Sequence, residues 1–239
     1  KNKSIALRLD PIYGDGHHKK VITAGEDCKF GIDISDIDQV INICKENNIK
    51  VIGLHCHKGS GINNPKLWTE NAIFLFSFLD KFKDLEFINL GGGLGVDLNL
   101  EEVNKYFIDN IKLKNIKIFI EPGRYIVANS GVLVSKVSQV KTKNKTNYIG
   151  LNTGMNSLIR PSLYNAYHPI FNINNLDSKV KYKYNVVGPI CESGDIFGKN
   201  IELPETKIND LILIDTCGAY GYTMASHYNL RNPAKEIII

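Results

Sequence analysis

Hydrophobic and polar positions in the first half of the chain alternate between two spacings. Short apolar runs bounded by polar residues are typical of buried strands, and they occur at 4–9, 51–56, 87–90 and 116–120. Apolar residues at helical spacing occur within 35–44, 66–82 and 103–113, and Ser35 stands where a helix cap is expected. Strands that alternate with helices in this way predict a parallel sheet or a β/α barrel.

The pattern changes after Arg124. Strand-like runs separated by Gly, Asn and Pro occur at 132–137, 148–151, 184–187 and 211–214, without a comparably clear helical stripe. This half therefore predicts a mostly antiparallel β domain. The fold class expected is α/β followed by all-β, with domains at 1–126 and 127–239.

Three unusual loops follow successive strands of the first half: His55–Gly61, Gly91–Gly95 and Glu121–Arg124. In a β/α barrel the carboxyl ends of the strands form the rim that carries the active site. Three such loops at corresponding positions therefore predict a functional site there.

Each loop permits a chemical and a structural interpretation. Consecutive glycines at 91–93 let backbone N–H groups approach an anion such as a phosphate, but they also suit a tight strand-to-helix turn. Arg124 offers a planar fork for phosphate or carboxylate. Glu121, which ends an apolar strand, needs a cationic partner and could form a structural salt bridge.

His55 and His57 are two residues apart on a strand, so their side chains point the same way. They could form a metal pair, or one ring could serve as a platform for a ligand. Ser60 and Gly61 could extend the anion site.

Three clusters in the second half do not resemble ordinary strand sequence, although loops rich in turn residues could account for each. They are Arg160–His168, Gly188–Asp195 and Asp215–Tyr222. Cys191, taken alone, could simply be a buried and inert thiol.

Composition narrows the functional classes. The chain has 29 basic and 25 acidic residues, a net charge of +4, and scattered lysines, so no nucleic-acid surface is expected. Its five cysteines are widely spaced, which indicates neither a disulfide framework nor a zinc site and favours the cytoplasm. No apolar run is long enough for a membrane span, and no signal peptide is recognised.

Taken in order, these motifs resemble the fold-type III pyridoxal-phosphate-dependent decarboxylases, most closely the diaminopimelate decarboxylase group, from about Leu7 to Asn232. The resemblance implies part of an alanine-racemase-like (β/α)8 barrel that binds pyridoxal 5′-phosphate, followed by a C-terminal β domain. It implies a carbon–carbon lyase that converts meso-2,6-diaminopimelate to L-lysine, the last step of lysine biosynthesis. The partner it implies is a second copy of the chain, in a homodimer with shared active sites.

The resemblance also implies roles for individual residues. His57 would stack on the cofactor ring and Glu121 would pair with its nitrogen. The phosphate and its surroundings would be bound by Ser60, Gly91, Gly92, Gly93, Pro122, Gly123, Arg124 and Tyr220. Cys191 would return a proton as general acid, reaching with Glu192 into the partner's site. The substrate would be held by Arg124, Arg160, Tyr164, Glu192 and Tyr220.

Charge bears on the substrate. Diaminopimelate carries an ammonium and a carboxylate at its far end, which Glu192 and Arg160 would match. Ornithine has no far carboxylate, so it would leave Arg160 unpaired, at a cost of about 3–5 kcal/mol.

Two residues depart from the family pattern: Lys58 replaces an apolar residue and His227 replaces an Asn. Lys58 is expected to point away from His57. The family's cofactor-bearing lysine lies in a Tyr-Ala-x-Lys-Ala-type motif that this sequence lacks. The chain is therefore expected to begin partway round the barrel, to stop before the final strand and helix, and to be inactive alone.

Three alternatives remain open. The first is a related decarboxylase of another basic amino acid or polyamine precursor. The second is a metal-dependent barrel hydrolase that uses His55 and His57. The third is a non-catalytic homologue.

Overall fold

The structure is a computed structural model that describes residues 3–25, 28–111, 116–179 and 181–239. It divides into two compact units, Lys1–Tyr125 and Ile126–Ile239. The domain boundary expected from the sequence lies one residue later, between 126 and 127.

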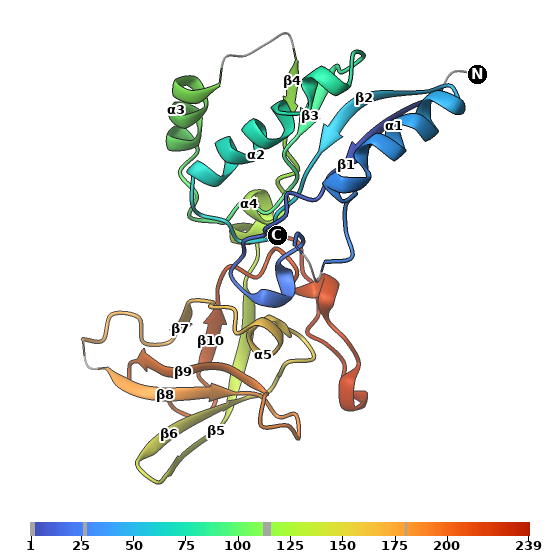
Figure 1. Ribbon diagram of the computed structural model, residues 1–239. Helices are drawn as coiled ribbons and strands as arrows, with labels where there is room; N and C mark the ends of the chain where they lie inside the picture. Colours follow the sequence, from blue (N-terminus) through green and yellow to red (C-terminus); the bar gives the residue numbers. More distant parts are fainter. Residues whose placement is uncertain (1–2, 26–27, 112–115, 180) are drawn as a thin grey trace. The chain divides into compact units, whose positions relative to one another are not determined.

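The first unit is built on a four-stranded parallel sheet with its strands in chain order, as Figure 1 shows. Its strands are β1 (Lys3–Arg8), β2 (Ile49–His55), β3 (Phe87–Asn89) and β4 (Lys117–Phe119). The helices between them are α1 (Ile37–Glu46), α2 (Lys66–Phe76) and α3 (Leu100–Asn110). Arg8, His55, Asn89 and Phe119 are in register, so the segments after them leave from one edge.

Local chemistry sets the helix ends and corrects two expectations. Ser35 caps no helix: it lies within a 3-10 turn, Ile34–Asp36, that precedes α1. Asp33 caps this turn, because its carboxylate accepts hydrogen bonds from the backbone N–H and hydroxyl of Ser35. α2 ends at Phe76 and is followed by a separate 3-10 turn, Leu79–Lys81, instead of continuing to residue 82. Leu113, the predicted end of the third helix, lies outside the described residues.

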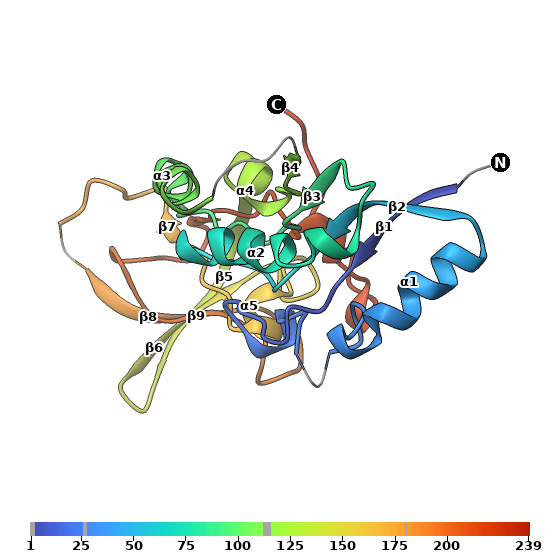
Figure 2. The same ribbon diagram turned by 45° about the horizontal axis from the view of Figure 1, so that its top comes forward.

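One apolar core joins the sheet of the first unit to its helices. Leu54 and Ile88 from the strands are fully buried together with Ala72 and Leu75 of α2, and Ile37 of α1 joins the same cluster. Figure 2 shows α2 packed along the strands. Burying each large aliphatic side chain contributes about 1.5–3 kcal/mol to the free energy of unfolding. This core holds the four strands in place and therefore also the edge from which the loops leave.

The second unit is a six-stranded mixed sheet in the order β7-β10-β5-β6-β8-β9. Its strands are β5 (Leu133–Lys143), β6 (Thr146–Leu151), β7 (Ile170–Asn172), β8 (Tyr182–Val187), β9 (Ile196–Leu203) and β10 (Leu211–Ile214). Neighbours are antiparallel except β6 and β8, which are parallel. Asn144 and Lys145 join β5 to β6 with φ of 49° and 66°, as in a type I′ hairpin turn.

Two short helices were not predicted from the sequence. α5 (Arg160–Tyr164) has Pro161 in its first turn and is capped at its C-terminal end by Asn165, whose φ of 52° is left-handed. α4 (Arg124–Val127) follows the Glu121–Gly123 loop. Elements this short show little of the spacing by which a helical stripe is recognised.

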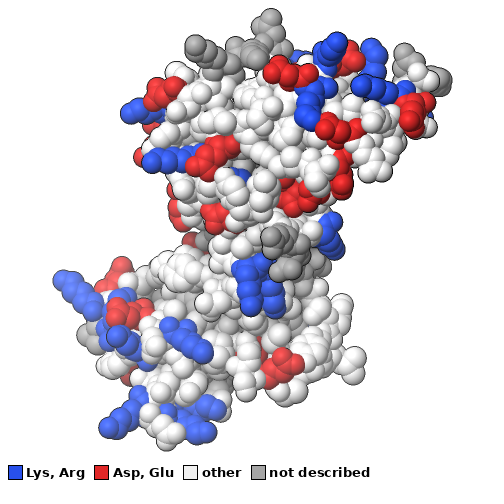
Figure 3. All heavy atoms as spheres, viewed as in Figure 1, with Lys and Arg blue, Asp and Glu red and all other residues white. Residues whose placement is uncertain are grey.

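Charged side chains of the first unit lie with both signs interspersed on the face that Figure 3 shows. Within the part of the chain that the structure describes, no helix is both long and apolar enough to cross a bilayer.

Candidate active site

The three loops singled out in the first half lie side by side. Backbone hydrogen bonds link Cys56 N to Asn89 O (3.0 Å), Leu90 N to Phe119 O (2.9 Å) and Glu121 N to Gly91 O (2.9 Å). The parallel pairing therefore continues past the strand ends. It brings His57, Gly91 and Glu121 to neighbouring positions on one edge.

Glycine is required where these loops touch. At Gly91, with φ of 73°, an added Cβ would lie 2.5 Å from Cys56 O and 2.8 Å from His57 Cβ. At Gly93, with φ of 98°, it would lie 2.0 Å from Gly59 O. Left-handed φ and close backbone approach both exclude a larger residue. The structural interpretation of the glycines, as a tight turn, therefore holds beside the anion-binding one.

The imidazole of His57 is fixed by the glycine loop. Its Nδ1 lies 3.1 Å from Gly92 N, which donates, so the neutral ring carries its hydrogen on Nε2. Burial lowers the pKa of His57, and the nearby Arg8 guanidinium lowers it further. Burial also lowers the pKa of His55, while the Glu121 carboxylate, 3.8 Å from His55 Nε2, opposes that shift. The lowered pKa values therefore favour the neutral form of both His55 and His57.

Asn89 joins the site although the sequence analysis missed it. Its Nδ2 donates to Glu121 Oε1 at 2.8 Å, and its Oδ1 accepts from Gly91 N at 2.9 Å. One amide thereby orients the carboxylate and holds the turn. The available signal was a polar residue at the end of an apolar strand, two positions before the glycines.

The remaining predicted residues of this unit lie on the same loops. Ser60 is partly buried, and its backbone oxygen accepts from His17 N at 3.0 Å. Pro122 and Gly123 lead into α4, where Arg124 is the first residue and is partly buried.

Lys58 is buried, with 2% of its surface exposed. Its Nζ lies 4.4 Å from the Tyr13 ring centroid and 3.8 Å from Glu70 Oε2. Burial lowers the pKa of this lysine. Lys58 is thus engaged with Tyr13 and Glu70.

In the second unit, Cys191 and Glu192 lie in the loop between β8 and β9. The buried carboxylate of Asp195 holds this loop in place. Asp195 is 3% exposed, and its carboxylate accepts hydrogen bonds from Ile190 N and Met155 N, each at 2.7 Å. Burial raises the pKa of Asp195. Cys191 itself is exposed, which argues against the buried, inert thiol.

A segment near the end of the chain meets this loop. Asn229 Nδ2 lies 3.0 Å from Cys191 Sγ, and the Tyr228 hydroxyl donates to Glu192, which raises the pKa of Tyr228. His227, the departure noted above, directly precedes them. Both contacts were missed because nearly forty residues separate the partners.

Arg160, Tyr164 and Tyr220 are also placed in the second unit. Arg160 opens α5 and is 6% exposed, with Nη1 3.0 Å from His168 Nε2. Tyr164 ends the same helix and is partly buried. Tyr220 follows β10 in left-handed backbone, with φ of 60°, and is exposed.

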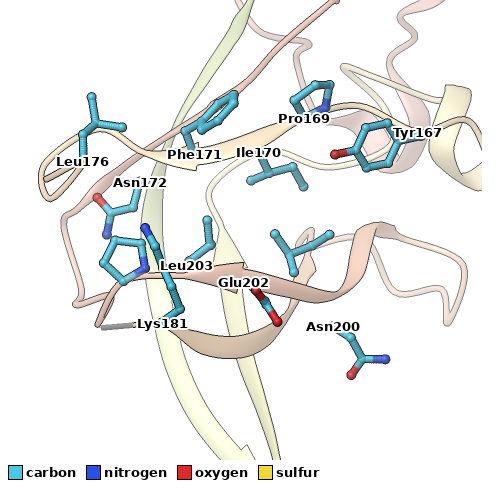
Figure 4. A pocket seen from close by; sticks show the side chains of 12 residues that line it. Tyr167, Pro169, Ile170, Phe171, Asn172, Leu176, Lys181, Asn200, Glu202 and Leu203 are labelled. Atoms are coloured by element: carbon cyan, nitrogen blue, oxygen red, sulfur yellow. The ribbon is translucent and has the colours of Figure 1, made fainter. Parts of the chain in front are cut away.

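A hollow of about 620 Å³ in this unit lies between β7 and β9 (Figure 4). It is lined by apolar residues such as Ile170, Phe171 and Leu203 together with Lys181 and Glu202. The described residues that line it include none of the predicted site residues. No group of three or more potential metal ligands is found among the described residues, so the metal-dependent alternative gains no support.

Comparison with known proteins gives the site its context. Residues 1–128 match the model of the pyridoxal-dependent decarboxylase pyridoxal binding domain, and residues 105–218 match that of the C-terminal sheet domain. The chain belongs to the pyridoxal-dependent decarboxylase family. The predicted family and fold class, a pyridoxal-binding barrel domain followed by a β domain, are confirmed.

Curated members of the family are similar along nearly the whole chain. Diaminopimelate decarboxylase of Aquifex aeolicus is 34% identical over 100% of this chain, and that of Bacteroides thetaiotaomicron is 39% identical over 98%. The chain spans 60% and 64% of the length of these relatives.

Solved structures of the family agree. Diaminopimelate decarboxylase from Helicobacter pylori complexed with L-lysine has a TM-score of 0.83 and 32% identity, covering 95% of this chain and 59% of that one. An arginine decarboxylase of Paramecium bursaria Chlorella virus has a TM-score of 0.81 over 95% of this chain and 63% of its own, but at 20% identity it shows the fold alone.

The residues of the first unit fit the family's cofactor. A flat imidazole, a carboxylate held by Asn89 and a turn that admits no Cβ suit an aromatic ring with a basic nitrogen and a phosphate. The amides of Gly91 and Gly92 already donate to Asn89 and His57. Those two glycines therefore contribute to the phosphate cradle, the turn formed by Gly91, Gly92 and Gly93, through close backbone packing.

Proposed function

We propose that the full-length protein decarboxylates meso-2,6-diaminopimelate to L-lysine with pyridoxal 5′-phosphate. The observation that carries this proposal is similarity of 34–39% identity to diaminopimelate decarboxylases over nearly the whole chain. The lysine bound to the Helicobacter relative is the product that this reaction would release. An ammonium-binding Glu192 and a carboxylate-binding Arg160 supply the matching charges.

At the cofactor, His57 would stack on the ring while its Nδ1 stays bonded to Gly92. Glu121, held by Asn89, would keep a proton on the ring nitrogen. The phosphate would be bound by Ser60, the cradle of Gly91, Gly92 and Gly93, the Pro122–Gly123–Arg124 segment and Tyr220. When bound, pyridoxal phosphate supplies the electron sink for the pair left behind as carbon dioxide departs.

Cys191 would deliver the proton that replaces the carboxylate on the substrate carbon. Its thiol is exposed, and the Asn229 amide donates to its sulfur, so the S–H bond can turn toward the substrate. Asp195 fixes the loop that carries this thiol. A positioned general acid of this kind contributes about 10²–10⁴-fold to turnover.

Glu192 would bind the ammonium of the non-reacting end, and Arg160 would bind its carboxylate. Arg124, Tyr164 and Tyr220 would complete the contacts to the substrate. Tyr228 already donates to Glu192, which orients the carboxylate.

The active assembly proposed is a homodimer in which Cys191 and Glu192 serve the partner's substrate. The cytoplasm is the proposed location, and free thiols at all five cysteines agree with a reducing compartment.

The test measures carbon dioxide release by the full-length protein from meso-diaminopimelate and from ornithine. We expect diaminopimelate to be preferred by about 10²–10⁴-fold, because ornithine leaves Arg160 without a carboxylate, at about 3–5 kcal/mol. Arg160→Met should abolish most of this preference. Equal turnover of ornithine by the unaltered protein would support the alternative, a decarboxylase of another basic amino acid.

A further inference from the structure

His168 forms a buried bridge to which the proposed function gives no role. It lies just before β7 and is 1% exposed. Its Nδ1 lies 2.9 Å from the backbone oxygen of Asp215, and its Nε2 lies 3.0 Å from Arg160 Nη1. One ring therefore joins the end of β10 to the first residue of α5.

The two partners determine where the ring carries its hydrogen. A carbonyl oxygen only accepts, so Nδ1 must donate to Asp215 O. A guanidinium only donates, so Nε2 must offer its lone pair to Arg160. Only the neutral ring with hydrogen on Nδ1 satisfies both contacts.

The anchor of this ring is part of the sheet. Asp215 N donates to Pro169 O at 2.8 Å, which continues the pairing of Ile214 with Ile170. Cys217 Sγ lies 3.8 Å from His168 Nδ1, and burial raises the pKa of Cys217 to about 12, so this thiol stays uncharged. Arg160 is a charged side chain that the ring contacts.

We propose that His168 is a positioning residue that orients Arg160 toward the carboxylate at the non-reacting end of the substrate. The proposal rests on the proposed function of Arg160. A guanidinium binds a carboxylate best through two parallel N–H groups, which requires its plane to be fixed. A bond from Nη1 to a ring that is itself held by β10 fixes this plane.

Two isosteric replacements separate the two contacts of the ring. The amide of His168→Asn lies near the Nδ1 position, so it keeps the bond to Asp215 O but loses Arg160. The amide oxygen of His168→Gln reaches the Nε2 position and can accept from Arg160. Both side chains are neutral and polar, which makes them matched variants.

The first measurement is steady-state decarboxylation of diaminopimelate by the full-length holoenzyme. His168→Asn should raise KM about 10-fold with kcat little changed, because a hydrogen bond to a charged group is lost. His168→Gln should restore most of the loss. In an Arg160→Met background, His168→Asn should have no further effect on KM.

A second measurement isolates the carboxylate. L-Lysine keeps the carboxylate of the non-reacting end, whereas cadaverine lacks it. His168→Asn should weaken binding of L-lysine about 10-fold and leave that of cadaverine unchanged. A third measurement, the ¹⁵N spectrum of histidine-labelled unaltered protein, should show His168 with its hydrogen on Nδ1, and it depends on no variant being folded.

Any of four results would overturn the inference. The first two are an equal KM for His168→Asn and His168→Gln, and an equal loss of affinity for L-lysine and cadaverine in His168→Asn. The other two are an undiminished effect of His168→Asn on KM in the Arg160→Met background, and a His168 ring with its hydrogen on Nε2. Unaltered protein without diaminopimelate decarboxylation would overturn the proposed function and this role with it. If the unaltered protein decarboxylates diaminopimelate but one of the four results is obtained, only the role of His168 is refuted and the proposed function stands.

Discussion

We expect Gly91→Ala to damage the cofactor site from within the backbone. Left-handed φ costs a residue with a Cβ about 1–2 kcal/mol. Gly91 has a φ of 73°, and the new methyl would lie 2.5 Å from Cys56 O and 2.8 Å from His57 Cβ. Relieving such overpacking costs about a further 1–3 kcal/mol. The free energy of unfolding should therefore fall by about 2–5 kcal/mol.

The same methyl pushes against His57, so the surviving folded protein should bind the cofactor less tightly. The assay combines denaturant unfolding of the full-length protein with absorbance titration of pyridoxal phosphate. Gly194→Ala is the matched control, because a Cβ there has no atom within 4 Å, and its effect should stay within about 0.5 kcal/mol. If Gly91→Ala behaved like Gly194→Ala in both measurements, the reasoning from the cradle would be refuted.

Three further predictions follow from the site. Cys191→Ala should slow turnover by about 10²–10⁴-fold with unchanged pyridoxal phosphate affinity, whereas Cys28→Ala, at a partly exposed thiol outside the site, should match the unaltered enzyme; near-normal turnover of Cys191→Ala would assign the proton elsewhere. Asn89→Ala should weaken pyridoxal phosphate binding about 10-fold in an absorbance titration, because Glu121 loses its donor; unchanged affinity would contradict this. Burial raises the pKa of the Cys56 thiol from 9.0 to about 12, so the unfolded chain loses this proton at lower pH than the folded protein does, and the free energy of unfolding should fall as pH rises through that range. Cys56→Ala should make this fall with pH shallower when it is measured by urea unfolding. An identical dependence on pH in the variant would exclude this cause.

Periodicity was sufficient to predict the parallel sheet of the first half and the position of its three loops. The strands at 51–56 and 87–90 were recognisable because both are nearly continuous apolar runs, as expected when helices cover a sheet. Loops that follow parallel strands must meet at one edge, so the neighbouring positions of His57, Gly91 and Glu121 followed from topology. The cap was misassigned because Asp33 and Ser35 are both good caps, and only the folded structure shows that Asp33 caps the 3-10 turn Ile34–Asp36 that precedes α1.

Partners distant in sequence could not be predicted. His168 bonds to Asp215, 47 residues away, and a histidine in a polar segment carries no sign of either contact. Asn229 and Cys191 are 38 residues apart and meet only because separate loops fold together. Asn89 lies within a predicted element, but its role depends on a carboxylate supplied by the next strand.

The parallel pairing of β6 with β8 has a consequence for the order of folding. β5–β6 and β8–β9 are hairpins that close from local contacts, whereas parallel neighbours can pair only after the intervening residues 152–181 have crossed over. Arg160, Tyr164 and His168 all lie in this crossover. We therefore expect Arg160, Tyr164 and His168 to become ordered late, when the two hairpins dock. A slow docking step would then delay recovery of activity behind recovery of β structure during refolding.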